Sequence, residues 1–308
     1  MKNLEDFLRP SQKQLFKRLC KKFKSRTLIS KGNFILVHGQ APVMLVAHLD
    51  TVHSQRVHDI CKSDDGNILM SPQGIGGDDR CGVFALVKIY KLAKIKPWLL
   101  FTCDEEVGGV GAKKFCRAHN HHQLPNQLDN LKFIIEIDRK GSRDAVFYSC
   151  ANPDFEAYIS GKGFQSAQGS FSDISLIAPE LGIAAVNLSC GYHNPHTLHE
   201  YINCSELNFT IQKVIEIVSD SANLDFPKFE YVESCGSLYL SQKNPPYDNL
   251  SILYNKQDGI SRRIPSELKG IYEALLDFYS PNELDSFRAE FGDQILWQIY
   301  NDEIASFY

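Results

Sequence analysis

The chain has 308 residues, of which 43% are hydrophobic, and its 33 basic and 37 acidic residues give a formal net charge of −4. This length and composition allow a sizeable buried core, and we expect one main domain with an appendage. The acidic balance excludes the broad basic surface that binds nucleic acid, so we expect no nucleic acid partner.

The N-terminal residues show no pattern of a targeting signal. Charged residues interrupt the stretch 1–10 where a signal peptide would need an apolar centre, and no apolar run reaches the length of a membrane span. The nine cysteines are scattered, and their odd number argues against a disulfide framework. We therefore expect a cytoplasmic protein with reduced cysteines and no membrane contact.

Strand and helix patterns alternate along the first two thirds of the chain. The expected strands are 27–39, 42–49, 97–105, 131–138, 144–150 and 182–190, and the expected helices are 79–95, 111–119, 171–181 and 205–220. Several strands are apolar throughout, which is typical of strands buried on both faces. The pattern predicts an α/β fold with a mixed, mainly parallel sheet that helices cover on both faces.

The character of the sequence changes after residue 222. An irregular stretch is followed by helical patterns, one of which begins at a capping box formed by Ser280 and Glu283, with Pro281 in the first helical position. We therefore divide the chain into a main domain, residues 1–222, and a mainly helical C-terminal extension, residues 223–308, which we expect to pack on it.

Four of the expected strands end in residues of the types that commonly bind metal ions. In open parallel sheets, ligands bind beyond the carboxyl ends of the strands. The residues at these ends are His48 and Asp50, Glu105 and Glu106, Asp138, and the histidines of segment 191–200. His48 and Asp50 are two residues apart, so their side chains leave an extended segment on the same side. This spacing suits a histidine ligand whose second ring nitrogen is held by a carboxylate.

Two acidic stretches have both a metal-binding and a structural interpretation. Neighbouring carboxylates at 104–106 repel one another, and a divalent cation relieves this by binding one of them while the next accepts a proton from water. A solvated acidic turn is the alternative. Asp78 and Asp79 follow a glycine-rich loop and could bind a cation or cap the helix that follows.

Six motifs in a fixed order resemble those of the co-catalytic dizinc exopeptidases, which include peptidase T, the tetrahedral aminopeptidases and the bacterial leucyl aminopeptidases. The motifs are AHLDTV (47–52), GGDDRCG (76–82), DEEVGGVGA (104–112), IEIDRKG (135–141), GSFSD (169–173) and HTLHE (196–200). The resemblance covers about residues 40–220, and it implies the zinc exopeptidase fold in a catalytic domain. The gaps between the motifs are too short for the extra domain that the relatives insert, so we expect no inserted lid.

The resemblance also implies a role for each matching residue. The implied metal ligands are His48, Asp78, Glu106, Asp138 and His196. Asp78 would bridge the two metal ions, with a cis peptide bond after it, and Asp50 would orient His48. Glu105 would be the general base that takes a proton from the attacking water. We expect two divalent ions, zinc by resemblance, with Co²⁺ and Mn²⁺ as alternatives.

The last ligand and the oxyanion donor are less determined by the sequence. His193 and His199 compete with His196, which the family pattern favours because a glutamate, Glu200, follows it four residues later. Tyr192, His193 and Asn194 are candidates for the oxyanion donor. The histidines at 119–122 match no motif, so we expect a structural or solvated role for them.

The favoured function is a dizinc aminopeptidase that acts on short peptides. A deacylase of N-acyl amino acids, or a carboxypeptidase, could use the same site. From another class, the chain could be an inactive relative that acts as a binding module, although such proteins usually lose ligands. A serine hydrolase is disfavoured because GSFSD lacks the G-x-S-x-G pattern of a nucleophile elbow. The oligomeric state is left open.

Overall fold

The computed structural model describes residues 1, 3–30 and 32–234 and isolated positions between 268 and 296. The chain divides into two compact units, Met1–Lys243 and Asn244–Tyr308, and all elements named below belong to the first. Apart from single positions, the expected extension beyond residue 234 and its helix after Ser280 lie outside the described residues. The boundary at residue 222 therefore stays a prediction.

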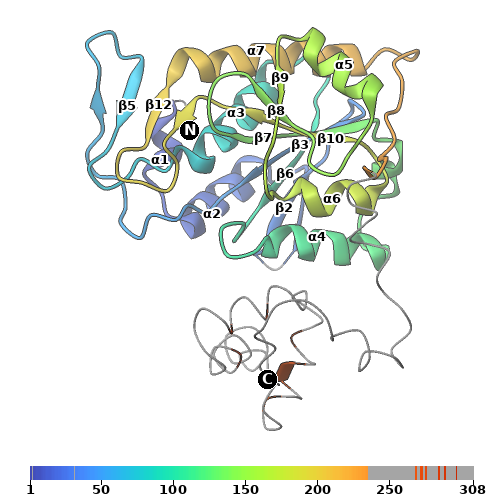
Figure 1. Cartoon of the computed structure of the whole chain (residues 1–308), viewed down its shortest axis with the longest axis horizontal. Coiled ribbons are helices and arrows are strands. Elements are labelled where there is room, and N and C mark those ends of the chain that lie inside the picture. The colour runs from blue at the N-terminus through green and yellow to red at the C-terminus, as the bar shows by residue number, and fades with distance from the viewer. Residues whose placement is uncertain are drawn as a thin grey trace, which may run out of the picture. The chain divides into compact units, whose positions relative to one another are not determined.

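An eight-stranded sheet forms the centre of the first unit (Figure 1). Its order is β1-β2-β6-β3-β7-β10-β8-β9, and the adjacent strands β6, β3, β7 and β10 run parallel. The strands are β1 (Thr27–Ser30), β2 (Phe34–Val37), β3 (Val43–His48), β6 (Trp98–Thr102), β7 (Phe133–Arg139), β8 (Asp144–Val146), β9 (Gln165–Ala167) and β10 (Ala185–Ser189). The predicted mixed, mainly parallel α/β fold is confirmed.

Helices cover both faces of this sheet (Figure 1). One face packs against α1 (Glu5–Leu8), α2 (Gln12–Lys22), α3 (Gly77–Leu92), α5 (Pro153–Gly161) and α7 (Cys204–Ser221), and the other against α4 (Val110–Asn120), α6 (Ile174–Leu181) and the 3₁₀ helix η1 (Asn126–Asn130). In β3, Leu45 and Ala47 belong to the first core and Met44 and Val46 to the second. This alternation explains why the strand is apolar throughout.

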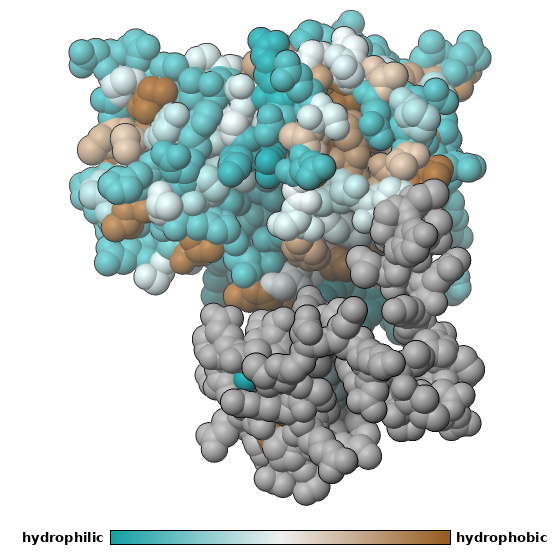
Figure 2. Space-filling view, viewed as in Figure 1, coloured by the Kyte–Doolittle hydropathy of each residue, from teal (hydrophilic) through white to brown (hydrophobic). Residues whose placement is uncertain are grey.

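The visible face of the first unit is mainly polar (Figure 2). On the face shown in Figure 2, hydrophilic residues dominate and apolar residues lie singly or in small groups. Among the described residues, the structure contains no helix with the length and apolar character needed to cross a membrane.

A second, smaller sheet was not predicted. It has the order β11-β12-β5-β4, with β4 (Cys61–Lys62), β5 (Ile68–Met70), β11 (Tyr192–His193) and β12 (Tyr201–Asn203). Tyr201 pairs with Met70 in antiparallel register. This pairing places the loop between β11 and β12 beside the glycine-rich loop that precedes α3.

Segment 27–39, which we expected to be one strand, forms the two antiparallel strands β1 and β2. Gly32 lies between them at φ +86°, a conformation that favours glycine and turns the chain. The apolar content of the segment predicted strand structure correctly, and the polar stretch 30–33 around this glycine was the available signal for the turn.

Gly82 allows α3 to approach β7 closely. A Cβ at Gly82 would lie 2.0 Å from the carbonyl oxygen of Ile137, whereas a Cβ at Gly161, the last residue of α5, would meet nothing within 4 Å. We expect Gly82→Ala to lower the free energy of unfolding by about 2 kcal/mol or more because the helix must shift. Gly161→Ala should change it by less than about 0.5 kcal/mol. Urea denaturation measures both, and equal stabilities would contradict this packing.

Candidate metal centre

The carboxyl ends of three neighbouring strands, β3, β6 and β7, bring most of the candidate residues together. His48 ends β3 in register with Thr102, which ends β6. Asp138 is the last residue but one of β7. Asp78 enters from the first turn of α3, where its peptide bond to Asp79 is cis, as the family resemblance implies. Residues that are far apart in the sequence thus meet at one edge of the sheet.

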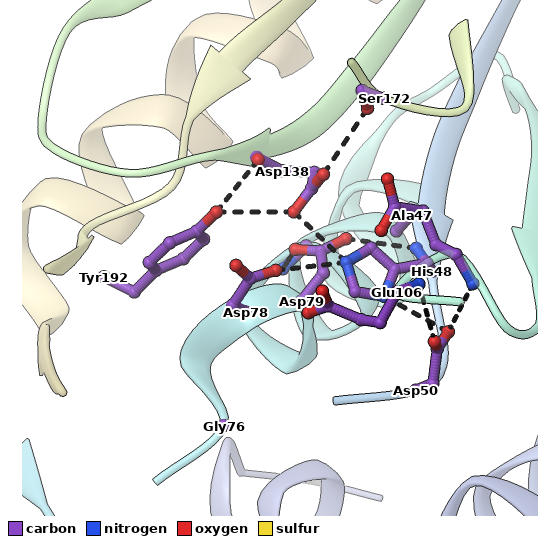
Figure 3. Close-up of polar contacts among 12 residues, drawn as sticks. Ala47, His48, Asp50, Gly76, Asp78, Asp79, Glu106, Asp138, Ser172 and Tyr192 are labelled. Atoms are coloured by element: carbon purple, nitrogen blue, oxygen red, sulfur yellow. Dashed lines mark hydrogen bonds and ion pairs between the residues drawn. The ribbon is translucent and has the colours of Figure 1, made fainter. Parts of the chain in front are cut away.

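His48, Asp78 and Asp138 form the first group of possible metal ligands (Figure 3). His48 Nε2 lies 3.0 Å from Asp78 Oδ1 and 3.4 Å from Asp138 Oδ1. One ligand atom of each residue lies within 4.8 Å of the others. The His48 side chain is almost completely buried, so the group is shielded from solvent on that side.

Asp78, Glu106 and His196 form a second group with the same spacing. His196 Nε2 lies 3.1 Å from Asp78 Oδ2 and 3.2 Å from Glu106 Oε1. Asp78 therefore directs one carboxylate oxygen to His48 and the other to His196, and it is shared by the two groups. Glu105 joins His48 and Glu106 in a third, overlapping group.

Asp50 contacts both the histidine and the glutamates. Its Oδ1 lies 3.3 Å from His48 Nδ1, the ring nitrogen that faces away from Asp78. Its two carboxylate oxygens also accept hydrogen bonds from the backbone N–H groups of Glu105 at 3.1 Å and Glu106 at 3.0 Å. Asp50 can thus orient the imidazole and the two glutamates at once.

The electrostatics of the cluster fit divalent cations. Burial raises the pKa of Glu105 to about 8, and burial together with the charge of Asp78 raises the pKa of Asp138 to about 7. Burial and Asp78 also raise the pKa of Glu106. Such crowded carboxylates are stabilised by a nearby cation. Imidazole nitrogens and carboxylate oxygens are ligands that suit zinc, cobalt and manganese.

Of the three histidines in segment 191–200, the structure brings His196 into one of the groups of possible metal ligands. His193 instead pairs with Glu206, with 2.6 Å between its Nε2 and Glu206 Oε2, and its ring stacks on Tyr201. His199 is exposed and belongs to none of the donor groups among the described residues. The geometry therefore favours His196 over the two alternatives that the sequence left open.

Two further residues considered in the sequence, Tyr192 and His119, have partners in the structure. The hydroxyl of Tyr192, proposed as an oxyanion donor, donates to the backbone oxygen of Asp138 at 2.9 Å. His119, from the histidine-rich segment 119–122, pairs with Glu180 at 2.8 Å and so links α4 to α6. Tyr192 thus supports a candidate ligand, and His119 has a structural partner away from the cluster.

A buried polar network behind Asp138 was missed by the sequence analysis. Asn187 Oδ1 accepts a hydrogen bond from Asp138 N at 2.9 Å, and Ser172 Oγ donates to the buried carboxylate of Glu136. Burial raises the pKa of Glu136 well above its usual value. The sequence could have indicated Ser172, because it lies in the motif 169–173. Nothing in the sequence indicated Asn187, because its contact with Asp138 depends on the pairing of β10 with β7.

Glu200 links the segments that carry Asp78 and His196. Its buried carboxylate accepts hydrogen bonds from Asp78 N at 2.9 Å and Gly76 N at 3.0 Å, and His53 Nε2 lies 2.9 Å from it. The family pattern indicated Glu200 without giving it a role. Its backbone partner Asp78 is 122 residues away in the sequence, and only the folded chain shows the contact.

Glu200→Gln leaves one acceptor oxygen for two backbone N–H groups, so Asp78 loses part of its support. We expect the affinity for Zn²⁺ to fall by about tenfold or more. Glu206→Gln is the matched control, because its carboxylate contacts His193 outside the donor groups. Calorimetric titration of both variants with Zn²⁺ measures this, and wild-type affinity in Glu200→Gln would rule out the supporting role.

The chain is similar in sequence to one protein family and in fold to several solved structures. The model of peptidase family M28 matches residues 35–215. Comparison with curated proteins gives no match. The fold is similar to that of a tripeptidase from Staphylococcus aureus, with a TM-score of 0.55 and 16% identity over 71% of this chain and 96% of that chain. The aminopeptidase PepT from Bacillus cereus has a TM-score of 0.54 and 15% identity over 71% of this chain and 97% of its own. An aminopeptidase from the archaeon Desulfurococcus kamchatkensis has a TM-score of 0.54 and 14% identity over 70% of this chain and 93% of its own.

Proposed function

The chain belongs to peptidase family M28 and is a metal-dependent peptide hydrolase, and we propose that it removes residues from the amino end of short peptides. The observation that carries this proposal is the shared carboxylate of Asp78, which faces His48 with one oxygen and His196 with the other. A carboxylate placed between two donor groups suits two neighbouring cations. We propose residues 1–222 as the catalytic domain.

In the proposed site, His48 and Asp138 would hold one cation, Glu106 and His196 would hold the other, and Asp78 would be shared by both. When bound, such cations polarise the scissile carbonyl and make a nearby water molecule more acidic. The nitrogen and oxygen donors support zinc as the proposed metal, and the same donors accommodate Co²⁺ or Mn²⁺.

Glu105 is the proposed general base. It lies in the donor group of His48 and Glu106, and its backbone N–H donates to Asp50 at 3.1 Å. A carboxylate oxygen of Glu105 takes a proton from water as the water oxygen attacks the carbonyl carbon of the substrate. It then gives that proton to the amide nitrogen as the C–N bond breaks. Asp50 keeps the glutamate in place during both transfers.

The two adjacent glutamates should respond differently to the same substitution. We expect Glu105→Gln to keep its metal ions but lose about a hundredfold to ten-thousandfold in kcat, because the amide cannot accept the proton. Glu106→Gln should lose metal, since it removes a charged ligand. Metal content by mass spectrometry and peptide hydrolysis measure both effects. Loss of metal in Glu105→Gln would instead identify Glu105 as a ligand.

The substrate class can be tested with matched derivatives of one peptide. We expect hydrolysis of a tripeptide with a free amino end, and little hydrolysis when that end is acetylated. Chromatography of the products shows which bond is cut. Release of the acyl group would favour the deacylase, and release of the C-terminal residue would favour the carboxypeptidase. Metal binding without turnover of any derivative would favour a binding module.

We also propose a cytoplasmic location for the enzyme. The described cysteines are all free thiols, which suits a reducing compartment. Short peptides are the proposed partners, and the oligomeric state is left open.

A further inference from the structure

The end of α1, the turn that follows it and the start of α2 contact two of the segments that bring acids into the metal centre. One is the turn 104–106 after β6, and the other is 78–80 at the start of α3. This N-terminal part of the chain precedes residue 35, where the match to the family model begins. Its contacts with the site are therefore a property of this chain that the family match does not describe.

Gln12 holds the turn after β6 through two hydrogen bonds. Its Nε2 donates to Asp104 Oδ1 at 2.7 Å, and its Oε1 accepts from Asp104 N at 3.2 Å. Asp104 has φ +58°, a left-handed conformation that residues other than glycine seldom adopt. Gln12 thus fixes both the side chain and the backbone of the residue directly before Glu105.

Three consecutive backbone N–H groups of this turn are each held by a side chain. Gln12 binds that of Asp104, while Asp50 binds those of Glu105 and Glu106. Asp50 belongs to the metal centre, and Gln12 reaches the turn from the start of α2. The direction of the two glutamates therefore depends on contacts from two separate parts of the chain.

Arg80 fixes the place of the α1–α2 turn itself. It is 2% exposed, and its Nη1 donates to the backbone oxygens of Phe7 at 3.0 Å and Pro10 at 2.9 Å. A buried guanidinium that loses its hydrogen-bond partners is costly. The turn therefore cannot move away from α3 without breaking these bonds, and Gln12 stays in reach of Asp104.

We propose that Gln12 is a positioning residue of the metal centre: through Asp104 it sets the direction in which Glu105 and Glu106 point. The inference rests on the proposed function of this site. Without Gln12, the side chain and the backbone N–H of Asp104 lose their hydrogen-bond partner. The side chains of Glu105 and Glu106 then sample other directions. Metal binding at Glu106 and proton transfer at Glu105 should both weaken, while the binding of substrate should change little.

The test compares Gln12→Ala with Gln14→Ala in the full chain. Gln14 lies on the same helix and shares a capping box with Ser11, so its loss destabilises α2 without touching Asp104. Three quantities are measured for each variant: the free energy of unfolding in urea, the affinity for Co²⁺ from its visible absorption spectrum, and kcat and KM for a tripeptide.

We expect Gln12→Ala to lower Co²⁺ affinity and kcat by about tenfold or more, with KM nearly unchanged. Gln14→Ala should lower stability alone. A rescue variant tests the hydrogen bonds directly: Gln12→Glu should impair the enzyme by facing Asp104 with a like charge. Adding Asp104→Asn should restore activity, because the new amide can donate to Glu at position 12.

Three outcomes would overturn parts of this argument. If the wild type is active and Gln12→Ala matches Gln14→Ala in Co²⁺ affinity and kcat, Gln12 is only a stabilising residue. Failure of Asp104→Asn to rescue Gln12→Glu would contradict the proposed hydrogen-bond pair. If the wild type binds no metal and cleaves no peptide, the proposed function itself fails.

Discussion

The metal centre depends on holding several carboxylates close together against their mutual repulsion. Asp78, Glu105, Glu106 and Asp138 meet at one edge of the sheet, where burial and mutual repulsion raise the pKa of Glu105, Glu106 and Asp138. The hydrogen bonds to His196 and His48 outweigh burial at Asp78 and lower the pKa of that carboxyl. His48 relieves part of this repulsion, and a bound cation would relieve more of it, which would couple the folding of this edge to its occupancy by metal. The surrounding structure can be understood as the means of keeping these acids in place.

The same device recurs around the acids: a side-chain oxygen from another element binds the backbone N–H of an acidic residue. The pairs are Glu200 with Asp78, Asp50 with Glu105 and Glu106, Gln12 with Asp104, and Asn187 with Asp138. Because a backbone N–H has a fixed direction, each bond orients the residue and not only its side chain. The sheet brings the acids together, and these bonds set where they point.

The sequence predicted the central part of the fold well because buried strands are recognisable from composition alone. Strands such as β3 are apolar throughout since both of their faces are covered, and polar residues stand out where they end. The same criterion treated β1 and β2 as one strand, although the polar stretch 30–33 separates their apolar residues. The small sheet that carries the His196 loop went unrecognised, since its strands have only two or three residues.

The sequence by itself determined the fold class and the set of residues available for metal chemistry, because strand periodicity and motif order are local properties of the chain. The roles of those residues stay predictions. Only the tertiary structure decided that His196, and not His193, joins Asp78, and that Gln12, Asn187 and Glu200 hold the surrounding backbone. These contacts join residues far apart in the chain, and a single hydrogen bond between distant residues leaves no periodic pattern in the sequence.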